Sequence, residues 1–238
     1  EYICQEIMEL VRQSIQKVAD HAKAAMQREK EAISAIMEGL VLSGIAMSYI
    51  GNSRPASGSE HHMSHYWEMM FLLAEKEDPL HGTKVGVGTV SALRLYEMLK
   101  DSQALLDSLQ TPHFQREDWE KQILDAYGPA ATGVLKLEEE IGKNSDEEVL
   151  RRRKNFLEHQ DEIWKVVDAL PSSKDIQKLL ESINAPFSPA QLQVPKEVFQ
   201  KGIFFAKDLR NRFGLLQILF DFGLQEAFSK KLMDEFYV

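Results

Sequence analysis

The sequence predicts an all-α protein, and three observations support that class. Apolar residues recur at helical spacing along most of the chain, glycine and proline are scarce at 13 and 8 of 238 residues, and no stretch alternates apolar and polar residues as a half-buried strand does. With 44% hydrophobic residues the chain can bury a substantial core. We therefore expect one all-helical domain over residues 1–238, without a repeat or a low-complexity linker.

Two long helices are expected at the start of the chain. Residues 2–27 carry an apolar stripe at a period of about 3.6 residues. A second helix should run from about residue 28 to residue 49, because Gly51 and Pro55 break the pattern beyond it.

The second of these helices is apolar enough to imitate a membrane span over residues 32–51. Glu38 lies in the middle of that stretch, where a charge would be costly in lipid. A helix that is apolar nearly all round also suits the centre of a large helical domain. We expect such a buried helix and no membrane span.

The next two helices flank a short break. A third helix should start near Ser59 and stop before the DPLHG stretch at residues 78–82, and helical spacing resumes over residues 87–100. His81 is therefore expected in a loop, where the following Gly82 would let the backbone come close to whatever the imidazole touches.

Capping residues mark the expected helix starts in the rest of the chain. Three groups have the residue types of a helix N-terminus: Ser145 with Glu148, Ser172 with Asp175, and Ser188 with Pro189 and Gln191. The first predicts a long helix to about residue 169, and the third is the strongest start signal in the chain. Residues 198–224 are rich in large apolar side chains and should complete the core.

Charge and cysteine content restrict the partners and the setting. A net charge of −9 argues against nucleic acid, whose phosphates need clustered Lys and Arg. The lone Cys4 cannot form a disulfide within the chain, which favours a reducing cytoplasm over secretion. The chain begins EYICQE, with neither a methionine nor a signal peptide, inside an apparent helix, so a fragment of a longer protein is expected.

The stretch SRPASGSEHHMSH at residues 53–65 is the most informative for function, because it holds three of the seven histidines. Imidazole ligates divalent metals and transfers protons near neutral pH, although a polar helix start on the surface would need neither property. His61 and His65 are four residues apart and share a helix face. His62 faces about 100° away and is expected to be non-functional. A short connection would bring His81 back toward the His61 face.

The other motifs in the sequence are weaker evidence for a function. A zinc peptidase needs Glu directly after its first histidine, and His62 occupies that position. The GVG at residues 86–88 follows no strand and has no third glycine, so a structural role is expected rather than a dinucleotide site. Arg210 and Arg212 could bind an anion or lie solvated on the surface, and Arg54 could meet a substrate phosphate or fix its own turn.

Two stretches carry a resemblance to a known family: residues 43–69 (SGIAMSYIGNSRPASGSEHHMSHYWEM) and residues 80–90 (LHGTKVGVGTV), with a weaker match over residues 204–224. They resemble the C-terminal domain of sn-glycerol-1-phosphate dehydrogenases. This family is a branch of the superfamily of glycerol dehydrogenase, iron-containing alcohol dehydrogenases and dehydroquinate synthase. The resemblance implies a dehydroquinate synthase-like, iron-containing alcohol dehydrogenase-like helical domain. It also implies a Rossmann-like domain that binds NAD or NADP and is absent from this chain, and a catalytic metal, usually zinc or nickel and possibly iron.

The same resemblance assigns roles to the histidines. His61, in the GSEH motif, and His81, in the HG motif, match metal ligands of the family, and His65 matches a catalytic residue beside substrate and nicotinamide. The family's third ligand is an aspartate upstream of EYICQE, so it is not in this chain. Asp20 lies well after the matching point and is rejected.

The implied reaction is the reduction of dihydroxyacetone phosphate to sn-glycerol 1-phosphate, a step of phospholipid biosynthesis, by a cytoplasmic homodimer. This chain alone should fold without catalysing, because hydride transfer needs a bound dinucleotide. The alternatives are a glycerol dehydrogenase, a dehydroquinate synthase-like relative, or a non-catalytic helical module that binds a metal or a partner. The metal and the choice of NAD or NADP stay open.

Overall fold

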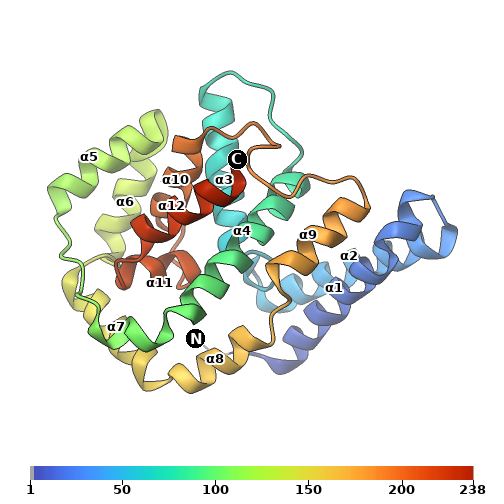
Figure 1. The fold of residues 1–238 in the computed structure, drawn as a ribbon, viewed down its shortest axis with the longest axis horizontal. Coiled ribbons are helices and arrows are strands. Elements are labelled where there is room, and N and C mark those ends of the chain that lie inside the picture. The colour runs from blue at the N-terminus through green and yellow to red at the C-terminus, as the bar shows by residue number, and fades with distance from the viewer. Residues whose placement is uncertain (1–2, 238) are drawn as a thin grey trace. The chain divides into compact units, whose positions relative to one another are not determined.

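A computed structural model describes residues 3–237, and among them it contains helices and no strand (Figure 1). The predicted all-α class is confirmed. By their internal contacts the described residues form two compact units, which we call unit 1 (residues 3–58 and 177–185) and unit 2 (residues 59–176 and 186–237). The assignment of residues 1–238 to one metal- and substrate-binding domain stays a prediction.

Unit 1 is built on a helical hairpin. It contains α1 (Gln5–Met26), α2 (Lys30–Ile50) and the single 3-10 turn η1 (Arg54–Ala56). The two long helices meet at Gly39, whose carbonyl accepts a 2.6 Å hydrogen bond from the hydroxyl of Ser14. A Cβ on Gly39 would lie 3.0 Å from the carbonyl oxygen of Ser14, so a side chain there would require α1 or α2 to shift by a few tenths of an ångström. As predicted, α2 ends at Gly51, which has a φ of 73°.

The prediction that α2 is a buried central helix is wrong. Only 11% of its most apolar stretch is buried, and several of its large apolar side chains are exposed: Ile33, Met37, Leu40, Val41, Ile45 and Tyr49. Its buried residues are small: Ala32, Ala35, Gly39 and Ala46. By length and composition alone α2 could cross a membrane. Glu38 in its middle accepts a 2.9 Å hydrogen bond from Lys17.

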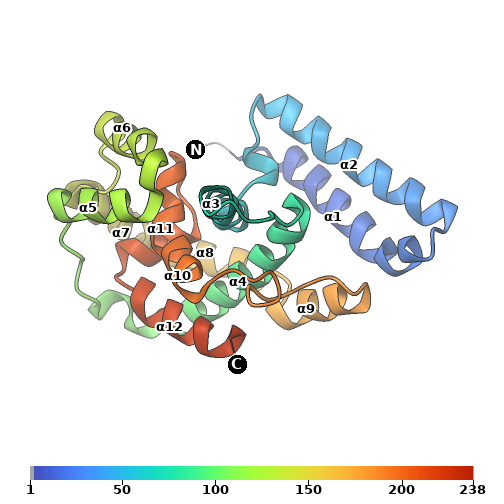
Figure 2. The same ribbon diagram turned by 90° about the horizontal axis from the view of Figure 1, so that it is seen from above.

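Unit 2 holds most of the helices. In chain order they are α3 (Ser59–Leu73), α4 (His81–Asp101), η2 (Gln103–Ser108), α5 (Arg116–Tyr127), η3 (Gly128–Ala130), α6 (Ala131–Ile141), α7 (Asp146–Glu158), α8 (Gln160–Asp168), α10 (Lys196–Phe205), η4 (Ala206–Leu209), α11 (Leu215–Asp221) and α12 (Gln225–Phe236). Helix α9 (Ser173–Ser182) begins in unit 2 and continues in unit 1. Helix α4 contacts α3, α8, α11 and α12, and α10 contacts α3, α5, α11 and α12 (Figure 2).

The core of unit 2 is aromatic. Tyr66, Trp67, Tyr127 and Phe199 have no exposed surface. Tyr66 and Tyr127 meet edge to face at 5.2 Å between ring centroids, and each hydroxyl donates to a backbone carbonyl. The apolar closing stretch supplies much of this core, as the sequence predicted.

Two of the three predicted caps are confirmed. The hydroxyl of Ser145 accepts from the backbone N–H of Glu148 at 3.4 Å, and that of Ser172 accepts from the N–H of Asp175 at 3.1 Å. The helix that starts after Ser145 is shorter than predicted, because the chain breaks at His159 into α7 and α8.

The third predicted cap is wrong, since residues 189–193 form turns and α10 begins only at Lys196. The side-chain oxygen of Gln191 accepts from the backbone N–H of Ser188 at 3.0 Å, which closes a local turn. Gln193 has a φ of 56° and Pro195 is the extended N-cap residue of α10. A left-handed residue followed by a proline cannot continue a helix, which explains the delay.

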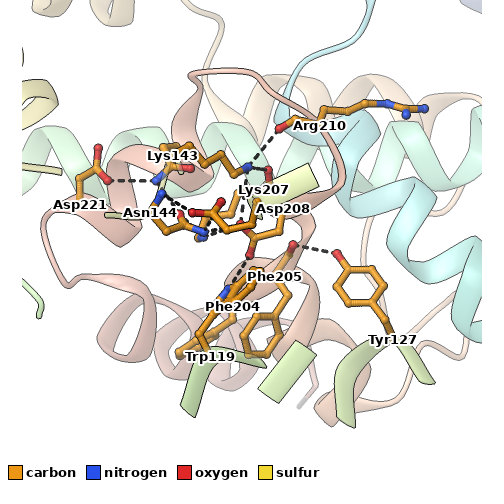
Figure 3. A network of polar contacts seen from close by, with 12 residues as sticks. Trp119, Tyr127, Lys143, Asn144, Phe204, Phe205, Lys207, Asp208, Arg210 and Asp221 are labelled. Atoms are coloured by element: carbon orange, nitrogen blue, oxygen red, sulfur yellow. Dashed lines mark hydrogen bonds and ion pairs between the residues drawn. The ribbon is translucent and has the colours of Figure 1, made fainter. Parts of the chain in front are cut away.

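A buried polar network joins η4 to the connection between α6 and α7 (Figure 3). The carboxylate of Asp208 accepts from Lys207 at 2.8 Å and from Asn144 at 2.9 Å, and the indole N–H of Trp119 donates to it at 3.4 Å. Lys143 lies 3.5 Å from the same carboxylate. Two buried ammonium groups therefore pair directly with one buried carboxylate, and the charge of a second buried carboxylate, that of Glu138, also acts between them.

The opposite charges in this network stabilise one another. Burial alone would raise the pKa of Asp208, but Lys207 and Lys143 outweigh it and keep that pKa below its ordinary value. Burial lowers the pKa of Lys143 to about 8, opposed by Asp208. Lys143 also donates to the backbone carbonyls of Lys207 and Arg210, at 2.5 and 3.0 Å. The network thus fixes the path of the chain between η4 and α11.

Helices α3 and α4 touch through backbone atoms. A Cβ on Gly88 of α4 would lie 2.6 Å from the carbonyl oxygen of Glu60 on α3. Real Cβ atoms do not approach a backbone oxygen so closely, so the two helices pack at this distance only because residue 88 is glycine.

Replacing Asp208 with Ala should lower the free energy of unfolding by ~3–5 kcal/mol, because Lys207 and Lys143 would be left as buried charges without their carboxylate. The control is Arg151→Ala, which removes an exposed pair with Glu148 and should cost at most about 1 kcal/mol. Urea unfolding followed by circular dichroism measures both. A loss below ~1 kcal/mol in the Asp208 variant would show that the network adds no stability.

Replacing Gly88 with Ala should destabilise the protein by ~1–3 kcal/mol, because the backbone of α3 or α4 must shift. Gly82→Ala in the same helix is the matched control, since a Cβ there meets nothing within 4 Å. That control should be neutral or stabilising by up to about 1 kcal/mol. Thermal unfolding compares the two variants, and equal melting temperatures would contradict the close approach of α3 and α4.

Candidate metal centre

The structure brings His61, His65 and His81 together on unit 2. The ring centroids of His61 and His65 are 6.2 Å apart, those of His61 and His81 5.4 Å, and those of His65 and His81 5.1 Å. The side chains of His61, His65 and His81 are 22%, 41% and 45% exposed, so a small ion or molecule can reach all three.

Local structure explains the convergence. His61 and His65 lie one turn apart on α3, as predicted, and the chain then turns back into α4. The expectation that His81 lies in a loop is wrong, because His81 is the first residue of α4. Gly82 therefore has no close approach to make, and the glycine that sets the helix distance is Gly88.

Two carboxylates border the rings, and neither was singled out from the sequence. Oε1 of Glu60 lies 2.9 Å from Nδ1 of His61. Oε2 of Glu68 lies 3.3 Å from Nδ1 of His65 and 3.8 Å from Nδ1 of His81. Glu68 falls three residues after His65, a spacing that places both on one helix face and could have indicated it.

A buried lysine, Lys84, lies close to Glu68. The side chain of Lys84 on α4 is fully buried, and its ammonium group donates to both carboxylate oxygens of Asp78. The same nitrogen is 3.8 Å from Oε1 of Glu68. Partial burial lowers the pKa of His81, and the neighbouring His65 lowers it further, while the charge of Glu68 opposes both. A neutral His81 is the form that ligates metal.

His62 differs from its neighbours. It is 6% exposed, and its Nε2 has no hydrogen-bond partner among the described residues. Burial lowers the pKa of His62 to about 4, and the positive charge of Arg212 adds to the effect. A neutral, enclosed ring is consistent with the expectation that His62 is non-functional, which stays a prediction.

The three arginines singled out from the sequence lie in different surroundings. Arg54 belongs to unit 1, where it lines a pocket of about 400 Å³ beside α1, and its backbone N–H donates to the side chain of Asn52 at 2.9 Å. In unit 2, Arg210 is exposed and its carbonyl accepts from Lys143. Arg212 is partly buried, and its charge acts on His62.

The donor set fits a transition-metal ion. His65, Glu68 and His81 offer donor atoms that all lie within 4.8 Å of one another, and the His61 ring adjoins them. Imidazole with carboxylate suits zinc, nickel or iron rather than magnesium or calcium, which prefer oxygen donors alone.

The described residues offer no dinucleotide fold. They contain no strand, and the GVG at residues 86–88 lies inside α4. Its Gly88 serves helix packing, so the expected structural role of this motif is borne out.

Comparison with known proteins gives no matching family model, but it finds curated relatives named glycerol-1-phosphate dehydrogenase (NAD(P)+). The one from Geobacillus thermodenitrificans is 31% identical over 225 residues, which are 94% of this chain and 47% of that protein. The relative from Halalkalibacterium halodurans is 29% identical, over 92% of this chain and 45% of that protein. The relative from Geobacillus stearothermophilus is 31% identical, over 91% of this chain and 45% of that protein.

The chain spans about half the length of these curated relatives, while nearly all of its own residues align with them. The predicted resemblance is thereby confirmed: the chain is similar to glycerol-1-phosphate dehydrogenases over about half of their length.

Proposed function

We propose that this chain is the metal- and substrate-binding part of a metal-dependent, NAD(P)-linked dehydrogenase that reduces dihydroxyacetone phosphate to sn-glycerol 1-phosphate. The observation that carries the proposal is the convergence of His61, His65 and His81 in a chain that aligns over 94% of its residues with a protein of that name. The coarser conclusion, a chain related to dehydrogenases, rests on the relatives alone.

His61 and His81 would hold the metal ion, with the third ligand supplied from outside this chain. The metal, when bound, polarises the ketone oxygen of the substrate as a Lewis acid. His65 lies beside both rings and is accessible, so it can hydrogen-bond that oxygen and deliver the proton that the alcohol product requires.

The cofactor would be NAD or NADP, held mainly by a dinucleotide-binding domain, because the described residues form no sheet on which such a site could be built. Zinc, nickel and iron all suit the donor set. A homodimer in the cytoplasm, acting in phospholipid biosynthesis, completes the proposal. Glycerol dehydrogenase and dehydroquinate synthase-like activities remain its alternatives within the superfamily.

A non-catalytic metal-binding module is the second candidate. It is favoured by the clustering of donor atoms from His65, Glu68 and His81 within this chain alone. The two functions differ in whether His65 is needed for turnover in a protein that joins this chain to a dinucleotide-binding domain of the same family.

Replacing His61 with Ala should remove bound metal, because a site reduced by one of its three ligands holds metal poorly. Elemental analysis after zinc loading gives the metal content of the protein that joins this chain to a dinucleotide-binding domain, in which the third ligand is present. His159→Ala, which changes an exposed histidine between α7 and α8, is the control and should leave the content unchanged. Full zinc content in the His61 variant would remove His61 from the site.

Replacing His65 with Ala should keep the metal and lower turnover by about 10²-fold or more, the usual contribution of a positioned proton-transfer group. NAD(P)H-dependent reduction of dihydroxyacetone phosphate, followed at 340 nm in the joined protein, is the assay. Unchanged turnover with metal retained would contradict the catalytic role and favour the non-catalytic module.

A further inference from the structure

All three histidines of the cluster have a glutamate carboxylate near the same ring atom. Nδ1 of His61 is 2.9 Å from Glu60, and Nδ1 of His65 is 3.3 Å from Glu68. Nδ1 of His81 faces the same oxygen of Glu68 at 3.8 Å. An ionised carboxylate only accepts hydrogen bonds, so in the neutral rings of His61 and His65 the proton is drawn to Nδ1. The 3.8 Å contact of His81 is too long for a hydrogen bond, but the negative charge facing Nδ1 favours the proton there as well. The lone pair is then on Nε2.

The carboxylate of Glu68 faces two histidine rings that belong to different helices. His65 belongs to α3, as Glu68 does, while His81 opens α4. One carboxylate oxygen, Oε2, faces both Nδ1 atoms, and the other, Oε1, faces Lys84. Glu68 is thus the group through which the side chains of the two helices are oriented toward each other.

Lys84 holds that carboxylate in place. Its ammonium group is fully buried, and a buried cation requires anionic partners. Asp78, in the loop between α3 and α4, supplies one directly, and Glu68 lies 3.8 Å away on the opposite helix. Rotating Glu68 away from the histidines would also move its charge away from Lys84, so the orientation that faces the rings is favoured.

We propose that Glu68 is a positioning residue, which keeps His65 and His81 in the Nδ1–H form so that both present Nε2 to the metal and the substrate. Neither the resemblance nor the relatives assign a role to this residue. The proposal rests on the proposed function for the use of the two Nε2 atoms. The tautomer itself can be measured without any metal or activity.

The first test is the protonation pattern of the histidine rings in the metal-free 238-residue chain. Long-range ¹H–¹⁵N correlation spectra at about pH 8.5, well above the ordinary histidine pKa of ~6.5, distinguish the two neutral tautomers. We expect His65 and His81 in the Nδ1–H form. In Glu68→Leu both should shift toward the Nε2–H form, whereas Glu68→Gln should retain the wild-type pattern because its amide oxygen still accepts.

His61 is the internal control, because its partner is Glu60 and its spectrum should stay the same in both variants. Circular dichroism verifies that each variant is folded. An Nε2–H pattern for His65 in the wild-type chain, or an unchanged pattern in Glu68→Leu, would overturn the proposal whatever the protein's activity.

The second test is cobalt binding, which reports on coordination through its visible absorption spectrum. If Glu68 acts from outside the ligand set, Glu68→Leu should weaken cobalt binding by ~10–100-fold with an unchanged spectrum, and Glu68→Gln should restore part of the affinity. A changed spectrum would make Glu68 a direct ligand and overturn the positioning role. The cobalt titration uses the protein that joins this chain to a dinucleotide-binding domain, so that the third ligand is present. Absence of cobalt binding there would count against the proposed function alone, since the tautomer test would still decide the role of Glu68.

Discussion

The candidate site depends on one backbone contact, the approach of Gly88 on α4 to the carbonyl oxygen of Glu60 on α3. The residue that supplies this carbonyl lies directly before His61, and Gly88 lies two turns after His81 on α4. The distance between the metal-binding ends of the two helices is therefore determined by a contact that admits no side chain. A wider spacing would leave His81 beyond the reach of the two histidines on α3.

Unit 2 contains two polar clusters with opposite environments. Around Asp208 the charges are buried and paired, and their hydrogen bonds hold the chain between η4 and α11 (Figure 3). Around Glu68 the histidines are partly exposed, and their carboxylate contacts occupy Nδ1. The first arrangement suits stability, because a buried charge without its partner is costly. The second suits binding, because Nε2 remains available to a ligand.

The sequence predicted what depends on local rules. Helical periodicity, the caps at Ser145 and Ser172 and the placement of the histidines on α3 follow from spacing along one chain segment. The buried position expected for α2 did not follow, because apolar composition does not reveal that the residues of α2 that are buried are small ones. The sequence does not reveal the start of α4 at His81, because Pro79 and Gly82 are residue types that usually break a helix, although a proline two residues before a helix does not prevent it.

Packing contacts between segments that are distant in the sequence could not be predicted from the sequence. Gly88 looks like part of a loop motif until its distance from Glu60 is known. Glu68 and Lys84 look like solvated charges on two helices, and only packing shows that Lys84 is buried between carboxylates. Conversely, the cap predicted at Ser188 failed because the conformations of Gln193 and Pro195 postpone the helix.

The central claim is that His61 and His81 hold a divalent metal ion. Anomalous diffraction at the zinc absorption edge, from crystals of the chain grown with zinc, tests it most directly. The account predicts one strong peak at ~2.0–2.1 Å from Nε2 of both His61 and His81, with Glu68 outside bonding distance. A peak coordinated by His65 and Glu68 without His61, or no peak in the cluster, would contradict it.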